Sequence, residues 1–291
     1  MAQVAVSVQS CGVSRDQRRL HRAMGCGGSK TVDAMVTSFL FQPPDVASYT
    51  ETSFKGELIW VPIKGEESKN DAFPCRLLQG DKAAYLILYF KRNGDDLGSC
   101  RWFCEKLKNK LRLHVLAVEY PGYGLCTSQP TVEGLMVHAI SALDFVEHEL
   151  SWPLDRVLVV GSCLGAGAAI HVAAAKSVGG LVLISPFLTL KKMFAKRIGP
   201  LAECVEEQFR NEELAPVVQS PMLMIHGIRD KMVPMKEAQL LFDLFQCRKE
   251  LVTLEDAGHQ TSQMKDEDHM WNPIVEFFSL HDAEHRSLSI P

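Results

Sequence analysis

Short apolar runs alternate with amphipathic segments along most of this chain, and this alternation constrains the fold more than any other feature. Strands that are apolar on both faces and alternate with helices are typical of a mostly parallel sheet covered by helices on either side. The pattern therefore predicts an α/β fold with eight strands. The expected strands span residues 57–63, 73–78, 84–90, 114–119, 156–160, 181–184, 222–226 and 251–254, and the expected helices span 97–111, 131–150, 163–176, 235–245 and 269–280.

One α/β domain is expected to cover residues 40–280. Within it, residues 187–215 form a charge-rich helical insertion between the sixth and seventh strands, which is where a lid over a binding site would lie. Residues 1–39 are expected to be a disordered or targeting leader, and 281–291 a polar tail. No apolar run approaches the roughly 18 residues that a membrane-spanning helix needs, so any membrane contact is expected to be peripheral.

The net charge argues against nucleic acid as a partner, and the cysteine content indicates the redox state of the compartment. The chain has 31 Lys and Arg against 35 Asp and Glu, a net charge of -4, so no basic field attracts nucleic acid. The 9 cysteines are odd in number, show no short repeated spacing and follow no secretory signal. Free thiols in a reducing compartment are therefore expected, and the chain is predicted to be cytoplasmic. A monomer is expected as well.

A lipidation pattern lies near the N-terminus. Residues 24–30 read M-G-C-G-G-S-K, which fits the N-myristoylation pattern at Gly25, and Cys26 could carry the palmitoyl chain that stable anchoring requires. The pattern applies only if translation starts at Met24, because Gly25 must then become the N-terminus. Residues 1–23 are otherwise a basic tail or an organellar transit peptide. Lipidation would place the chain on the cytosolic face of a membrane.

Two patterns with metal-ligand residues are not expected to bind metal. Residues 281–285 read H-D-A-E-H and match a zinc-peptidase pattern, but no later His or Glu completes the coordination. Cys100 and Cys104 lie one helical turn apart and lack two further ligands, so packing is the expected role. The sequence therefore predicts neither a metal nor a cofactor.

The densest chemical signal is the motif G-S-C-L-G at residues 161–165, which follows an apolar strand and opens a small-residue helix. Gly161 and Gly165 stand two positions either side of Cys163, the arrangement of a nucleophile elbow, in which glycines clear space around the exposed central side chain. Ser162 does not fit the centre because its flanking positions hold bulky Val and Leu. The motif predicts Cys163 as nucleophile, with its thiolate stabilised at a helix N-terminus; a buried structural cysteine is the alternative.

A base and an orienting acid follow in the chain order that such elbows require. Asp230 comes directly after the seventh predicted strand, and His259 after the eighth. Because open α/β sheets gather their reacting groups beyond the carboxyl ends of the strands, Cys163, Asp230 and His259 are expected to meet at one edge.

These motifs resemble the α/β-hydrolase superfamily over about residues 40–280 and, more narrowly, family 17 of the α/β-hydrolase-domain proteins, the membrane-tethered protein depalmitoylases. The resemblance implies hydrolysis of ester or thioester bonds, including protein S-acyl thioesters, through an acyl-enzyme. It also implies a lipidated N-terminus and so favours a start at Met24. The matching segments are F-Q-P-P at 41–44, N-G-D-D-L-G at 93–98, E-Y-P-G-Y-G at 119–124, the elbow, the Asp230 loop and A-G-H at 257–259.

Two departures from the family bear on activity. Cys163 stands where the family has serine, although dienelactone hydrolases carry cysteine there. The oxyanion N–H groups are expected from Leu164 and Asn93, and residues 90–92 read F-K-R where the family has His-Gly before the asparagine. Losing the glycine removes conformational freedom at Arg92, and losing one aligned donor costs about 3 kcal/mol of transition-state stabilisation. Lys91 and Arg92 are expected on a solvated loop, or as positive charge near an anionic substrate.

Two hypotheses therefore stand at the level of sequence. In the first, Cys163 attacks an ester or thioester, His259 moves the proton and Asp230 orients His259. In the second, the chain is a catalytically inactive homologue that acts as a membrane-associated binding or scaffold protein.

Overall fold

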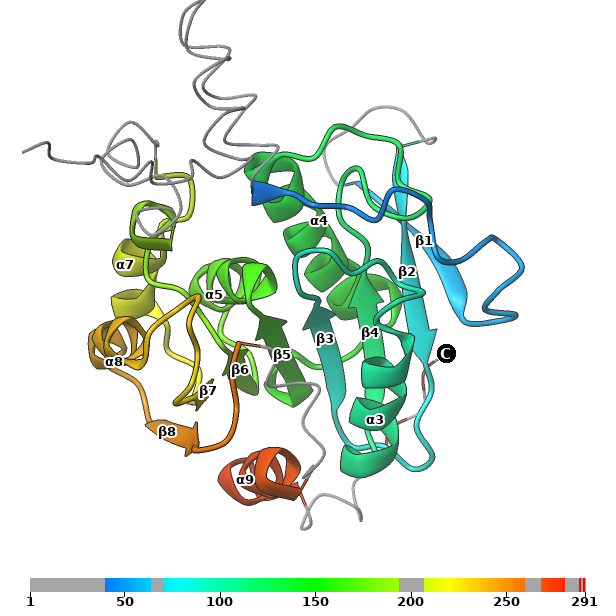
Figure 1. Ribbon diagram of the computed structural model, residues 1–291. Helices are drawn as coiled ribbons and strands as arrows, with labels where there is room; N and C mark the ends of the chain where they lie inside the picture. Colours follow the sequence, from blue (N-terminus) through cyan, green and yellow to red (C-terminus); the bar gives the residue numbers. More distant parts are fainter. Residues whose placement is uncertain are drawn as a thin grey trace, which may run out of the picture.

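The protein is described by a computed structural model that covers residues 40–63, 71–193, 207–259, 268–280, 288 and 290. Eight strands form one sheet in the order β1-β2-β4-β3-β5-β6-β7-β8 (Figure 1). The strands are β1 Leu58–Pro62, β2 Ala72–Leu78, β3 Leu86–Phe90, β4 His114–Val118, β5 Val157–Ser162, β6 Gly180–Ile184, β7 Met222–Gly227 and β8 Lys249–Leu254. The α-helices are α3 Arg101–Leu111, α4 Val132–Asp144, α5 Leu164–Ala175, α7 Asn211–Leu214, α8 Met235–Leu244 and α9 Asp268–Phe277.

The sheet is mostly parallel, as predicted. Strands β1 and β2 pair antiparallel, β2 joins β4 antiparallel, and every other neighbouring pair is parallel. Each predicted strand overlaps an observed one, so the predicted α/β class and strand number are confirmed.

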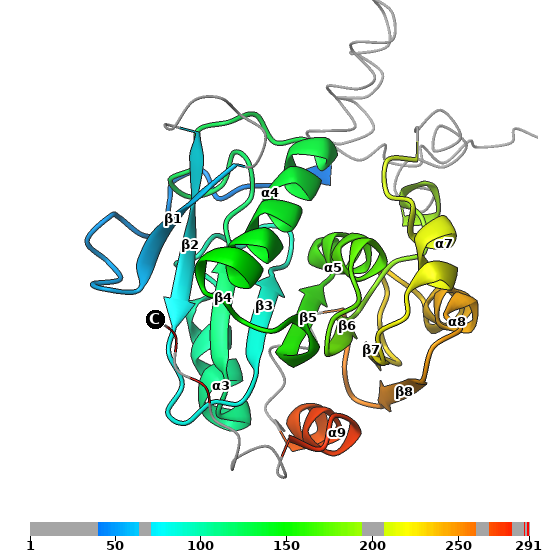
Figure 2. The same ribbon diagram turned by 180° about the vertical axis from the view of Figure 1, so that it is seen from behind.

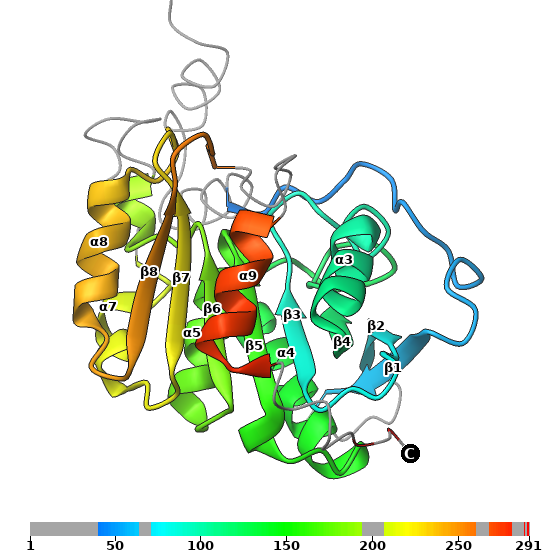
Figure 3. The same ribbon diagram turned by 90° about the horizontal axis from the view of Figure 1, so that it is seen from below.

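Helices cover both faces of the sheet. Figures 1 and 2 show opposite views, and Figure 3 shows α3 and α9 on one face and α4 and α5 on the other. Strand β3 shows why two layers are needed: Leu86, Leu88 and Phe90 pack in one apolar core, whereas Ile87 and Tyr89 pack in the other. Successive side chains of a strand point to opposite faces, so a continuous apolar run requires a helix layer on each side.

The residues at the two ends of helix α4 determine where the helix begins and ends. Thr131 caps it, because its hydroxyl accepts a hydrogen bond from Gly134 N at 3.0 Å. The α-helix ends at Asp144, and a single π-turn, Phe145–Glu149, completes the segment that the sequence predicts as one helix.

Several predictions fall on residues outside the described ranges. They are the lipidation sites Gly25 and Cys26, the H-D-A-E-H pattern at 281–285, and residues 194–206 of the expected lid. The described parts of that insertion include α7, which ends at Leu214 ahead of Pro216. Among the helices that the structure describes, none combines the length and apolar character needed to cross a membrane.

Candidate active site

Cys163 lies at the sharp turn between β5 and α5. Its backbone adopts φ 52° and ψ -111°, a region that a non-glycine residue occupies only under strain. The turn is fixed because Cys163 N donates to Ile184 O of the neighbouring strand at 2.9 Å and Cys163 O accepts from Ala166 N at 3.0 Å. The thiol is thereby held at the N-terminus of α5.

Two glycines let strand and helix approach at this turn. A Cβ added to Gly161 would lie 2.4 Å from Gly165 O, and one added to Gly165 would lie 2.2 Å from Phe90 O. Both contacts are far below van der Waals distance and involve backbone atoms. The steric requirement that the G-S-C-L-G spacing predicts is therefore present in the structure.

The structure brings the predicted nucleophile, base and acid together. His259 Nε2 lies 3.0 Å from Cys163 Sγ, and His259 Nδ1 lies 2.8 Å from Asp230 Oδ2. The three residues follow β5, β8 and β7, so they meet at the carboxyl edge of the sheet as expected. This chain of hydrogen bonds has the geometry that moves a proton between a nucleophile and an oriented base.

The loop that carries Asp230 is tightly held. Asp230 Oδ1 accepts hydrogen bonds from Met232 N at 2.8 Å and Val233 N at 2.9 Å. Burial alone would raise the pKa of Asp230, but the hydrogen bond and charge of His259, with these two amides, bring it below its ordinary value. Asp230 is therefore a carboxylate aimed at His259.

His226 supports this loop and was missed by sequence reasoning. Its Nε2 donates to Val233 O at 2.9 Å and lies 3.6 Å from Asp230 Oδ2, and its ring is fully buried. Burial lowers the pKa of His226, which favours the neutral ring. A histidine at the end of an apolar strand was the available signal, because a buried polar ring requires a partner.

His259 is strongly stabilised in its charged form. Burial opposes the charge, but hydrogen bonds and charge interactions with Asp230 and Cys163 outweigh it and raise the pKa of His259 to about 10. The charged ring lies 3.0 Å from Cys163 Sγ through Nε2, within reach of a group that leaves from this position.

This shift predicts a pH-dependent stability. A histidine whose folded pKa exceeds its unfolded value stabilises the fold fully below the unfolded pKa, here about 6.5, and loses that contribution as pH rises through the folded value of about 10. We expect the stability advantage of wild type over His259→Gln, measured by urea unfolding, to shrink between pH 6.5 and 10. The exposed His148→Gln variant serves as control. A constant wild-type advantage over that window would contradict the assignment.

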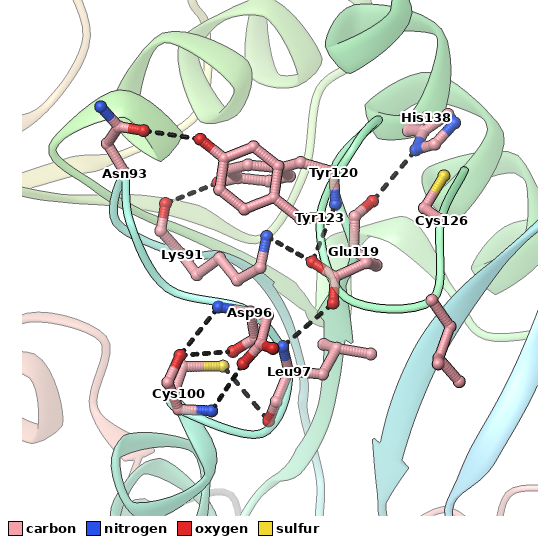
Figure 4. A network of polar contacts seen from close by, with 12 residues as sticks. Lys91, Asn93, Asp96, Leu97, Cys100, Glu119, Tyr120, Tyr123, Cys126 and His138 are labelled. Carbon is pink, nitrogen blue, oxygen red and sulfur yellow. Dashed lines mark hydrogen bonds and ion pairs between the residues drawn. The ribbon is translucent and has the colours of Figure 1, made fainter. Parts of the chain in front are cut away.

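The loop after β3 differs from the sequence-based expectation. Lys91 is not solvated: it is 0% exposed, and its Nζ lies 2.7 Å from Glu119 Oε1 (Figure 4). Arg92 pairs with Asp95, with Nε 2.9 Å from Oδ2 and Nη2 3.1 Å from Oδ1. Both cations are already neutralised within the protein, so the expectation of a free basic loop was wrong.

The backbone of this loop also corrects the expected cost of losing the family glycine. Arg92 is not among the residues with positive φ, whereas Gly94 has φ 86°. The left-handed turn therefore falls at a glycine, and Arg92 needs no glycine-like freedom.

The two predicted oxyanion residues come from the start of α5 and from the loop after β3. Leu164 is the first residue of α5, directly after Cys163. Asn93 uses its side chain to bind other parts of the loop: Oδ1 accepts from Tyr123 Oη at 2.6 Å, and Nδ2 donates to Leu40 O at 2.7 Å. The carboxamide is thus occupied, and the oxyanion role of the two backbone N–H groups stays a prediction.

A cavity of about 460 Å³ lies beside the elbow helix. Its walls come from the start of α4, from Gly167 and His171 of α5, and from residues 208–214 at the end of the expected lid. Gly167 lies one helical turn beyond Cys163, but Cys163, Asp230 and His259 are not among the residues that line this cavity.

One group of side chains among the described residues has the spacing of metal ligands, namely Asp144, Glu147 and His148. Lys176 Nζ lies 3.0 Å from Asp144 Oδ1 and also contacts Glu147 Oε2, so an ammonium group already occupies this acidic cluster. Cys100 and Cys104 have sulfur atoms 3.7 Å apart and pack in the apolar core beneath α3.

Comparison with known proteins agrees with this architecture. Residues 94–217 match the model of the "Alpha/beta hydrolase family". Human "Alpha/beta hydrolase domain-containing protein 17B" is 25% identical over 198 residues, covering 68% of each chain, and "Protein bem46" of Schizosaccharomyces pombe is 26% identical over 165 residues, covering 54% of this chain and 55% of that protein.

Solved structures show the same fold. The Pyrococcus furiosus esterase Pf2001 superposes with a TM-score of 0.63 at 17% identity, covering 82% of this chain and 98% of that chain. Est1E from Butyrivibrio proteoclasticus, bound to ferulic acid, gives 0.62 at 13% identity, covering 77% and 99%. The sheet order and these solved structures show the α/β-hydrolase fold, and the family match over residues 94–217 and the curated relatives show that the chain is similar to α/β-hydrolase-family proteins, among them the domain-containing protein 17B.

Proposed function

We propose that the protein hydrolyses carboxylic esters and thioesters through an acyl-enzyme on Cys163. The observation that carries this proposal is the unbroken hydrogen-bond chain from Cys163 Sγ through His259 to Asp230. A cysteine held by strain at the elbow, beside an oriented imidazole, is the arrangement of an activated nucleophile.

The reaction follows from these positions. The Cys163 thiolate adds to the substrate carbonyl, and the oxyanion that forms receives hydrogen bonds from Leu164 N–H and Asn93 N–H. The imidazolium of His259 then gives its proton to the departing alkoxide or thiolate, and the carbon–oxygen or carbon–sulfur bond breaks. His259 next removes a proton from water, which attacks the acyl carbon, and the acid product leaves Cys163 free.

The proposal can be narrowed to one class of substrate. Among esters and thioesters we place S-acylated protein cysteines first, because the matching motifs resemble the family of membrane-tethered depalmitoylases. Lipidation at Gly25 and Cys26 would bring the protein to the membrane that carries such substrates. The altered loop after β3 is the feature that favours the alternative, a membrane-associated binding protein without turnover.

Trapping the acyl-enzyme tests the proposal. After brief incubation with p-nitrophenyl butyrate and an acid quench, mass spectrometry should locate a butyryl group on Cys163 that hydroxylamine removes, together with p-nitrophenol release above the buffer rate. Cys126 and Cys247, which are only partly buried, provide internal controls for nonspecific thiol acylation. A folded protein with no p-nitrophenol release and no acyl group on Cys163 would support the binding-protein alternative.

A further inference from the structure

We infer that the buried Lys91–Glu119 pair and the Tyr123 hydroxyl are positioning residues, which hold the loop after β3 so that Asn93 N–H faces the oxyanion. The inference deepens the proposed function and rests on it. It assigns a role to Lys91, the first of the two cations that replace the family's His-Gly at this loop.

Glu119 is the centre of the network. It follows β4 and is fully buried; its Oε1 forms an ion pair with Lys91 Nζ at 2.7 Å and accepts a hydrogen bond from Tyr120 N at 3.1 Å (Figure 4). Its Oε2 accepts from Tyr49 Oη at 3.0 Å and Leu97 N at 3.1 Å. One carboxylate therefore ties together the segment before β1, the loop after β3 and the loop after β4.

Lys91 is held at both ends. Its ammonium group sits 3.3 Å from the centre of the Tyr120 ring, which adds a cation–π contact to the Glu119 ion pair, and its carbonyl accepts a hydrogen bond from Tyr120 Oη at 2.6 Å. A Cβ added to Gly165 would lie 2.7 Å from this same carbonyl. The backbone of Lys91 is therefore pressed against the first turn of α5, next to the nucleophile.

Tyr123 fixes Asn93 itself. Its hydroxyl donates to Asn93 Oδ1 at 2.6 Å, and it also accepts a hydrogen bond from Gln42 N at 2.9 Å. Asn93 Nδ2 binds Leu40 O, so every polar atom of the carboxamide has a partner away from an oxyanion. Asn93 can then serve the oxyanion only through its backbone N–H, whose direction the side-chain contacts set.

The burial of the Lys91–Glu119 ion pair explains why the loop after β3 is rigid. A buried ammonium or carboxylate is stable only when it is paired and hydrogen-bonded, so Lys91 and Glu119 each require the other in one geometry. The loop after β3 thereby has a fixed position before substrate arrives, which is what stabilisation of a developing oxyanion requires.

Tyr123→Phe is the sharpest test because it removes only one hydroxyl. We expect kcat for p-nitrophenyl butyrate to fall about 10-fold with KM within about twofold, since only transition-state binding is lost. Butyraldehyde adds to Cys163 as a hemithioacetal, R–CH(OH)–S–Cys, whose oxygen takes the oxyanion's place. Its inhibition constant should rise by about the same factor.

Matched variants separate positioning from stability. Tyr85→Phe removes a tyrosine hydroxyl at the opposite end of β3, outside the contacts of Glu119 and Asn93, and should leave kcat and butyraldehyde inhibition within about twofold of wild type. Lys91→Met should lower kcat by about 100-fold, the loss of one oxyanion donor. Adding Glu119→Gln to it removes the unpaired buried carboxylate, and should restore thermal stability but not kcat.

The outcomes are distinguishable. Active wild type with Tyr123→Phe unchanged in kcat and butyraldehyde inhibition would overturn the positioning role and leave the hydrolase proposal intact. Recovery of kcat together with stability in the Lys91→Met/Glu119→Gln variant would show that Lys91 acts only on the fold. Wild type that neither turns over the ester nor binds butyraldehyde would overturn both proposals.

Discussion

Cys163→Ala should abolish turnover of p-nitrophenyl butyrate, lowering kcat by about 10⁴-fold or more. Removing the nucleophile of such a triad costs as much as removing the whole triad, because the remaining groups have no covalent step to assist. The alanine side chain is smaller than cysteine and occupies the same strained backbone, so the fold should persist. Steady-state kinetics of the purified variant, with circular dichroism to verify folding, measure the effect.

Two neighbouring substitutions make this prediction specific. Cys163→Ser keeps a nucleophile at the elbow, and any acyl group trapped on it should be an oxyester that resists neutral hydroxylamine, unlike the thioester of wild type. Ser162→Ala alters the adjacent residue, whose hydroxyl is not part of the hydrogen-bond chain to His259, and should keep most of the activity. Loss of activity in Ser162→Ala with retention in Cys163→Ala would reverse the assignment of the nucleophile.

The elements of the fold were predictable because their signals are local. Strand β5 is apolar on both faces and its last two residues, Gly161 and Ser162, open the elbow motif, so strand, turn and helix can all be identified within a dozen residues. The order of Cys163, Asp230 and His259 was informative for a related reason. Each follows a strand, and a parallel sheet brings the carboxyl ends of its strands to one edge.

The environment of Lys91 was not predictable from its neighbours. The stretch K-R-N-G-D-D is polar throughout and has the composition of a solvated loop. Its burial depends on Glu119, Tyr120 and Tyr123, which reach it only because β3 and β4 are adjacent in the sheet. Pairing between strands is not encoded in local composition, and a buried charge is recognised only with its partner. His226 was missed for a different reason: its partners Val233 O and Asp230 are near it in the sequence, but their contact with the ring depends on the conformation of the loop after β7.

Gly165→Ala should destabilise the fold by about 3 kcal/mol or more and remove activity. The added methyl would lie 2.2 Å from Phe90 O and 2.7 Å from Lys91 O, and backbone atoms cannot rotate away as a side chain could. Relief therefore requires α5 and the loop after β3 to separate, which displaces both Cys163 and the Lys91 carbonyl. Thermal unfolding and ester turnover should both register the change.

Gly258→Ala is the matched control for this substitution. It lies beside His259, yet its Cβ would be 3.8 Å from Arg229 O, an ordinary contact, and its backbone is outside the left-handed region. We expect a change in unfolding free energy within about 0.5 kcal/mol, as for an unstrained substitution. A similar small effect of Gly165→Ala would mean that α5 and the loop after β3 do not touch as closely as the elbow requires, and would remove the steric basis for assigning Cys163 as the nucleophile.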